Sequence, residues 1–161
     1  MRVGIISDTH VPSAAARIPQ DVLAALAGVS LILHAGDVTH QRALRQLGAI
    51  APVEAVRGNC DSLALPATAL VTVGGFTIGV AHRGPWDETP DSLARLFQRR
   101  VDCAVFGHAH VSRIARAGET LVLNPGSPTA PRDGVRSVMV LNVGDNLQPE
   151  LIVLGAGRTG D

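Results

Sequence analysis

Carboxylate, amide and imidazole side chains recur in this chain directly after short runs of apolar residues. The first group is Asp8 with His10, which follows the apolar run of residues 3–6. Four further groups follow later apolar runs: Asp37, Asn59, His82, and His108 with His110. One such group alone is typical of a polar turn. Five groups made only of oxygen and imidazole donors instead indicate a metal site.

The position of these groups predicts that they meet at one edge of a sheet. Each apolar run is typical of a strand, and the donors stand where each strand ends. Open α/β sheets bind their ligands at the carboxyl ends of strands, where side chains from separate strands converge. Seven donors are too many for one ion and suit two. In two-metal sites the ions lie about 3.5–4 Å apart.

The ions of such a pair share a bridging ligand, and a carboxylate bridges more readily than an amide oxygen or an imidazole nitrogen. Asp37 is a carboxylate that stands alone at its strand end, so we identify it as the candidate bridge. A donor set without thiolate favours manganese, with iron, zinc, nickel or cobalt also compatible, over magnesium or calcium.

The elements that must position these donors alternate between strand and helix in the first third of the chain. Apolar runs predict strands at residues 3–6, 31–33 and 53–56. Helical spacing predicts one helix over residues 18–28 and a second that Thr39 caps and Gly48 ends. This alternation is typical of right-handed crossovers and a parallel sheet.

The rest of the chain is richer in hairpins. We predict them for residues 70–73 with 76–81, 112–115 with 119–123, and 135–143 with 147–154. Thr89 and Pro90 favour the start of a helix that extends to Phe97, ahead of a strand at residues 102–106. Residues 124–134 are predicted to form a loop. We expect one domain over residues 1–154 and a frayed tail over residues 155–161.

Composition describes a globular protein without a basic excess. Of its 161 residues, 46% are apolar and 17% charged, and 14 basic residues balance 14 acidic ones. A neutral chain argues against long nucleic acids as substrates. Cys60 and Cys103 indicate neither a disulfide framework nor a cysteine zinc site. The chain shows no signal-peptide pattern and no run of about 18 apolar residues, so we expect a cytoplasmic protein without membrane contact. The sequence is compatible with a homo-oligomer.

Taken in order, the motifs Asp-x-His, Gly-Asp, Gly-Asn, His and Gly-His-x-His resemble those of the calcineurin-like metallophosphoesterase superfamily. The resemblance is greatest to the small YfcE-type phosphodiesterases, to which the metallophosphoesterase-like subunit of retromer is related. The stretches that carry it are residues 7–10, 34–37, 58–61, 82, 107–110 and 124–127. The resemblance implies a four-layer αββα sandwich of two mixed sheets flanked by helices. It also implies one ion on Asp8, His10, Asp37 and His110, and another on Asp37, Asn59, His82 and His108.

The function implied is that of a metal-dependent phosphoesterase acting on small phosphoesters. Two ions lower the pKa of a bridging water, so that hydroxide attacks phosphorus in line. The ligands Asp37, Asn59 and His82 are the predicted catalytic residues. Phosphodiesters are favoured over phosphomonoesters. The alternatives are a phosphomonoesterase, a nuclease, or a binding scaffold like the retromer subunit, but the complete set of seven donors favours retained chemistry.

The chain departs from the family pattern after Asn59, where many relatives have a histidine that can serve as the leaving-group acid. Here Cys60 follows, which is a poor acid at its usual pKa and is interpreted as a small buried filler. Asp61 is predicted to orient a ligand histidine from behind. Without a leaving-group acid at this position, substrates with good leaving groups are favoured. His34 is predicted to point away from the site, and His40 to lie on the surface.

A second departure is the sequence His82-Arg83-Gly84, where relatives commonly have His-Gly-His. Arg83 can contact a substrate phosphate through two hydrogen bonds, or it can be a solvated loop charge. Arg132, in the loop after residues 124–127, is the other candidate for contact with phosphate. Trp86 is interpreted as a lid or packing residue, because it stands alone rather than in a base-stacking platform.

Overall fold

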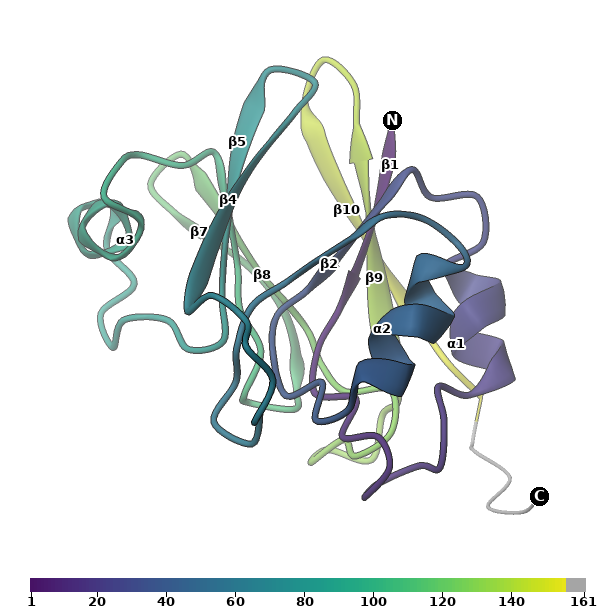
Figure 1. Cartoon of the computed structure of the whole chain (residues 1–161). Helices are drawn as coiled ribbons and strands as arrows, with labels where there is room; N and C mark the ends of the chain where they lie inside the picture. The colour runs from purple at the N-terminus through teal and green to yellow at the C-terminus, as the bar shows by residue number, and fades with distance from the viewer. Residues whose placement is uncertain (156–161) are drawn as a thin grey trace.

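A computed structural model describes residues 1–155 and shows two five-stranded mixed sheets lying face to face (Figure 1). The first sheet has the strand order β10, β9, β1, β2, β3. Its strands are β1 (Arg2–Ile6), β2 (Leu31–His34), β3 (Val53–Ala55), β9 (Ser137–Val143) and β10 (Leu147–Val153). β1, β2 and β3 are parallel to one another, and β9 and β10 form an antiparallel hairpin at the other side.

The second sheet has the strand order β4, β5, β6, β8, β7. Its strands are β4 (Thr68–Val73), β5 (Phe76–Ala81), β6 (Cys103–Val105), β7 (Ser112–Ala117) and β8 (Thr120–Pro125). The three central strands β5, β6 and β8 are parallel, and each outer strand is antiparallel to its neighbour. Both sheets thus contain three parallel strands, and the carboxyl ends of these strands carry the predicted donors.

Helices cover the outer faces of both sheets, which completes the four layers (Figure 1). α1 (Gln20–Ala25) and α2 (Gln41–Gly48) pack on the first sheet, and α3 (Pro90–Phe97) packs on the second. The core between the sheets consists of apolar side chains from both, including Ile5, Leu33, Ile78, Val105 and Leu141. The predicted αββα sandwich is confirmed. Among residues 1–155, no helix is long and apolar enough to cross a membrane.

Strand register brings the donors together. Ile6 pairs with His34, and His34 pairs with Ala55, so β1, β2 and β3 end side by side. Val80 pairs with Val105 near the ends of β5 and β6 in the other sheet. The loops that follow these strand ends therefore emerge at one edge of the sandwich, as expected for a ligand site in parallel sheets.

The predicted elements agree with the structure except at some boundaries. Thr39 was the expected cap of α2, but His40 is the N-cap, and its Nδ1 accepts the Arg42 N–H at 3.0 Å. The Thr39 hydroxyl instead donates to the Val11 carbonyl. The predicted loop of residues 124–134 is shifted by two residues, since β8 extends to residue 125 and β9 begins at residue 137.

The predicted tail of residues 155–161 lies outside the described residues except for Gly155. The Gly155 carbonyl accepts a hydrogen bond from the Arg136 guanidinium at 2.8 Å. Arg136 also pairs with Asp21 of α1 at 2.8 Å. Arg136 therefore links the Gly155 carbonyl to α1.

The buried inter-sheet core gives a direct test of the architecture. Leu141 is fully buried between the sheets, whereas Leu70 on β4 is 45% exposed. Leu141→Ala should lower the free energy of unfolding by about 2–5 kcal/mol, because it leaves a cavity in the core. Leu70→Ala is the matched control and should change it by about 0.5 kcal/mol. Urea unfolding measures both, and equal effects would contradict this placement of the core.

Candidate metal centre

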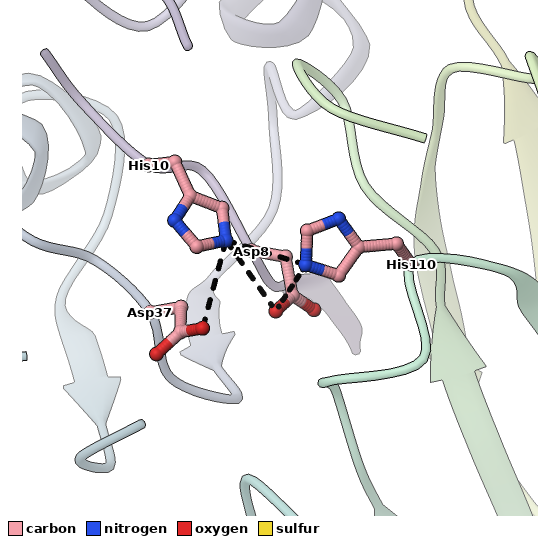
Figure 2. A group of neighbouring side chains, drawn as sticks. All are labelled: Asp8, His10, Asp37 and His110. Carbon is pink, nitrogen blue, oxygen red and sulfur yellow. Dashed lines mark hydrogen bonds and ion pairs between the residues drawn. The ribbon is translucent and has the colours of Figure 1, made fainter. Parts of the chain in front are cut away.

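Four side chains from three separate loops converge on one point. Each of Asp8, His10, Asp37 and His110 offers a ligand atom, and these atoms all lie within 4.8 Å of one another. Figure 2 shows the two carboxylates and the two rings turned toward a common centre. Asp8 Oδ1 lies 3.2 Å from His110 Nε2, and Asp37 Oδ2 lies 3.5 Å from His10 Nε2. These four are the set that the resemblance assigns to one ion.

The remaining predicted donors lie beside Asp37. His82 Nε2 is 3.4 Å from Asp37 Oδ2 and 3.1 Å from Asn59 Oδ1. The ring of His108 meets the ring of His82 edge-on, with 5.2 Å between the ring centroids. All seven predicted donors are therefore neighbours at one edge of the sandwich, although the sequence separates the first from the last by about a hundred residues. Their role as metal ligands stays a prediction.

Asp37 stands between the two donor sets. Its Oδ2 lies 3.5 Å from His10 Nε2 on one side and 3.4 Å from His82 Nε2 on the other. Its Oδ1 accepts the Cys60 N–H at 2.8 Å, which holds the carboxylate in place. Burial raises the pKa of Asp37, but the Cys60 N–H and the charge of His82 act more strongly and bring this pKa below its ordinary value. A carboxylate that stays ionised between two sets of donors fits the bridging position.

Backbone carbonyl groups orient two of the histidines that are predicted to bind metal. His82 Nδ1 lies 2.8 Å from the Ala35 carbonyl, and His110 Nδ1 lies 2.6 Å from the Ala130 carbonyl. A carbonyl oxygen only accepts, so in each ring Nδ1 carries the hydrogen and donates it. In the neutral rings Nε2 is then left with a lone pair facing the cluster, which is the form that binds metal.

Asp8 gives the clearest sign that the site suits a cation. Its Oδ2 accepts the Ser7 hydroxyl at 2.7 Å and the His108 N–H at 2.9 Å. Its Oδ1 is buried and, within the described part of the chain, accepts no hydrogen bond. Burial raises the pKa of Asp8 despite the opposing effects of Ser7 and His110. A buried carboxylate oxygen without a donor is costly, and a metal ion held with nearby imidazoles removes that cost.

The backbone at the donors adopts conformations that non-glycine residues avoid. Five of the seven donors have positive φ: Asp8 53°, His10 43°, Asp37 55°, His108 65° and His110 57°. Such residues are uncommon, and they cluster at functional sites where the surrounding structure holds them in place. The left-handed turn after each strand directs the side chain back toward the cluster instead of letting the strand continue.

Glycines in the Gly-Asn and Gly-His motifs are required by close approach. A Cβ on Gly58 would lie 2.1 Å from Asp37 Oδ1. A Cβ on Gly107 would lie 1.9 Å from the Ser7 hydroxyl oxygen and 2.9 Å from Asp8 Oδ2. Each glycine thus lets one donor loop pass against the carboxylate of another. The glycine before each donor in these two motifs therefore has a packing reason.

Asp61 has a different role from the one predicted. Its Oδ2 accepts the N–H groups of Asp37 at 2.9 Å and Gly58 at 2.7 Å, and its Oδ1 accepts that of Thr39 at 2.6 Å. The prediction that Asp61 orients a ligand histidine is wrong, because backbone amides of two loops occupy both of its oxygens. Asp61 instead ties the loop after β2 to the loop after β3, and so fixes Asp37 relative to Asn59.

Sequence reasoning missed the support from the loop after β8. The Ser127 hydroxyl donates to the Asp8 carbonyl at 2.8 Å and accepts the Ala130 N–H at 2.9 Å. Asn124 donates from its side-chain amide to the Gly107 carbonyl at 2.8 Å. This loop thereby holds both the Asp8 and the Gly107 segments and presents the Ala130 carbonyl to His110. The only signal was the polar cluster Asn-Pro-Gly-Ser itself.

Other predicted residues lie around the donors. Arg83 reaches the site, where its guanidinium donates to Asn59 Oδ1 at 3.2 Å. Arg132 is exposed, and its N–H donates to the His110 carbonyl at 3.1 Å. Cys60 is exposed rather than buried, so its interpretation as a core filler is wrong. Desolvation and the neighbouring Asp37 raise the pKa of Cys60, which keeps the thiol protonated.

His34 is turned away from the donors, as predicted. Its Nε2 lies 3.0 Å from the Thr9 hydroxyl, and its Nδ1 accepts the Gly36 N–H at 3.2 Å. These contacts join the segment after β1 to the segment after β2. Complete burial lowers the pKa of His34 to about 3, so the ring is neutral at physiological pH. His40 is exposed, in agreement with the prediction of a surface position.

Comparison with protein-family models matches residues 1–146 to the calcineurin-like phosphoesterase superfamily domain. The chain belongs to this superfamily. A probable metallophosphoesterase of Methanothermobacter thermautotrophicus is 40% identical over 162 residues, which cover 97% of this chain and 94% of that protein. A probable metallophosphoesterase of Methanocaldococcus jannaschii is 40% identical over 155 residues, which cover 94% of this chain and 81% of that protein.

Among solved structures, the chain is similar to wild-type Vps29 of Entamoeba histolytica complexed with zinc. The TM-score is 0.75 and the sequence identity 28%, and the match covers 95% of this chain and 99% of Vps29. The superfamily thus accounts for the four-layer fold, and together with the cluster of donors it suggests the use of a divalent metal.

The close approach at Gly58 predicts that this position controls metal binding. Gly58→Ala should displace Asp37 and weaken manganese or zinc binding by about tenfold or more, the scale of losses when ligand supports are removed. Gly48→Ala is the control, because a Cβ at Gly48 meets nothing within 4 Å. Isothermal titration calorimetry measures the affinities. Wild-type affinity in Gly58→Ala would contradict the contact with Asp37.

The low pKa of His34 predicts a pH-dependent stability. Between pH 6.5 and 5 the unfolded chain takes up a proton at this ring and the folded chain does not. Stability should therefore fall as pH falls through this window, with a contribution approaching about 1.4 kcal/mol per pH unit. His34→Gln should remove that contribution, and His40→Gln should keep it. Urea unfolding of chelator-treated protein across the window measures the slopes, and equal slopes in all three proteins would refute the assignment.

Proposed function

We propose that this metallophosphoesterase is a dinuclear enzyme that hydrolyses small phosphodiesters. The observation that carries the proposal is the position of Asp37 Oδ2, 3.5 Å from His10 Nε2 and 3.4 Å from His82 Nε2. An oxygen equidistant from two donor sets suits a ligand shared by two ions. Manganese is the proposed metal, and iron, zinc, nickel or cobalt also suit these donors. The zinc complex of Vps29 supports a divalent ion on this fold.

Two divalent ions bound here would supply an activated water for in-line attack and positive charge to offset the phosphoryl oxygens. The chain's own residues set the charge of the site. Among the seven donors only Asp8 and Asp37 are anionic, since Asn59 contributes a neutral amide and the histidines neutral rings. Two carboxylate charges against four metal charges leave the loaded site positive, and such a site attracts a phosphate anion.

Two arginines add to the positive electrostatic potential of the site. After desolvation by burial, Arg83, His82 and Arg132 lower the pKa of His108 against the effect of Asp8, which supports an influence of both guanidinium groups on the site. Arg83 is the better placed of the two, because it already donates to Asn59 Oδ1 at 3.2 Å. A guanidinium beside a metal ligand can bind a phosphate oxygen and hold the ester for attack.

The identity of the residue after Asn59 supports, as substrates, esters that have good leaving groups. Cys60 holds a protonated thiol whose pKa is raised by desolvation and by Asp37, so it is a weak donor of protons to a departing alkoxide. Protonation of the leaving group then falls to water, and esters whose alcohols are acidic need that help least.

Asp37→Asn tests the bridging role. The variant should lose activity toward bis-p-nitrophenyl phosphate in the presence of manganese by at least about a hundredfold, because an amide oxygen bridges poorly. Circular dichroism and urea unfolding should show a folded chain. Asp145→Asn, in the exposed turn between β9 and β10, is the control and should keep full activity. Metal analysis should show fewer ions bound per chain in Asp37→Asn, and full activity in this variant would refute the bridge.

The alternative is a protein-binding scaffold, which the similarity to Vps29 favours. A manganese-loaded protein that hydrolyses neither bis-p-nitrophenyl phosphate nor p-nitrophenyl phosphate would establish the scaffold over the enzyme. The ratio of kcat/KM for the two esters decides between diesterase and monoesterase. The zero formal charge weighs against a nuclease for long chains.

A further inference from the structure

A groove of about 780 Å³ opens directly beside the metal centre. Its near end is formed by Arg83, Gly107 and His108, so it is continuous with the donors. From there it passes between the loop after β5 and the start of β7, where Trp86 and Val111 line it. Its size is that of a site for a small organic molecule. A phosphate at the metal centre would therefore have room for one of its ester groups in this groove.

Beyond the metal end, apolar side chains form much of the groove wall, together with the paired charges of Glu88 and Arg113. Trp86 is fully exposed and Val111 is 38% exposed, while Phe106 and Leu123 form part of the lining from the core side. Small-molecule sites are lined mainly by apolar and aromatic side chains, so an exposed aromatic ring that lines a groove is a candidate for contact with a ligand. Tryptophan presents a rigid flat face, which suits another flat ring.

The loop that carries Trp86 is held in position. Glu88 forms an ion pair with Arg113 of β7, and both residues line the groove. Thr89 caps α3 by accepting the Ser92 N–H at 3.2 Å, which anchors the loop at its other side. Among residues 1–155, three charged residues line the groove, and two of them, Glu88 and Arg113, neutralise each other. The third is Arg83, which lies at the metal end. The groove thus has a cationic end for phosphate and an apolar body for a ring.

We propose that this groove binds the aromatic ester group of a phosphodiester whose phosphate lies at the metal centre, with Trp86 stacked on the aromatic ring. The proposal rests on the proposed function, because it gives that site its substrate class. It also revises the interpretation of Trp86 as a packing residue, since a fully exposed ring packs against nothing in its own chain. Trp86 is then a specificity-determining residue and takes no part in the attack on phosphorus.

Binding of phosphonates separates this proposal from catalysis, because phosphonates resist hydrolysis. Phenylphosphonate and methylphosphonate present the same charged group and differ in the ring. Zinc-loaded wild-type protein should bind the phenyl compound about tenfold more tightly, the scale of one stacked ring. Trp86 is the only tryptophan and the chain has no tyrosine, so the phenyl compound should also change the intrinsic fluorescence.

Variants at Trp86 test whether this side chain causes the tighter binding of phenylphosphonate. Trp86→Ala should lose the tenfold advantage of phenylphosphonate while its affinity for methylphosphonate stays unchanged, and Trp86→Phe should keep most of the advantage. Leu70→Ala is the control, because Leu70 is an exposed apolar residue that does not line the groove. Isothermal titration calorimetry measures all affinities. Equal binding of the two phosphonates by the wild type, or an unchanged advantage in Trp86→Ala, overturns the proposal.

Ester hydrolysis at the metal centre and binding of an aromatic group in the groove can be tested separately. A Trp86-dependent preference for the phenyl compound in a protein that hydrolyses no ester supports the groove and refutes the enzyme. Hydrolysis of bis-p-nitrophenyl phosphate without any preference among the phosphonates supports the enzyme and refutes the groove.

Discussion

Buried negative charge is the constraint on which this end of the molecule depends. Asp8 and Asp37 lie almost wholly buried where the two sheets meet, and imidazole nitrogens surround them. Within the described residues one oxygen of Asp8 has no hydrogen-bond donor. Neutral rings offset little of this charge, and a buried carboxylate without a partner is strongly unfavourable. A divalent cation is the partner that the arrangement of donors suits best.

The loops around these carboxylates are arranged to keep them in place. Asp61 gathers backbone amides from two loops, Ser127 and Asn124 secure a third, and Gly58 and Gly107 allow the loops to approach. Donors with positive φ are held by this network against their own backbone preference. The donors are thus held close together by contacts within the chain, and such preorganisation lowers the cost of binding a ligand. By contrast, the groove beside the donors is open and largely apolar.

Much of the fold was predictable because apolar periodicity reflects burial. The strand–helix alternation of the first third and the three hairpins correspond to observed elements, with shifts at their boundaries. The predicted N-cap of α2 was wrong because Thr39 suits the position by residue type, whereas the observed cap, His40, is not of a preferred type. In the structure the Thr39 hydroxyl is bonded to Val11, which is distant in sequence. The role of Asp61 was wrong for a similar reason, since backbone amides carry no sequence signature that could reveal them.

The sequence by itself determined which side chains stand at the strand ends, because a carboxylate or imidazole after an apolar run is visible in the order of residues. It also determined their family pattern and the absence of a histidine after Asn59. Only the tertiary structure decided that Asp37 stands between the two donor sets, that carbonyl groups of Ala35 and Ala130 orient the rings, and that Trp86 faces an open groove. These features depend on strand register and loop paths, which many distant contacts set together and no local stretch of sequence encodes.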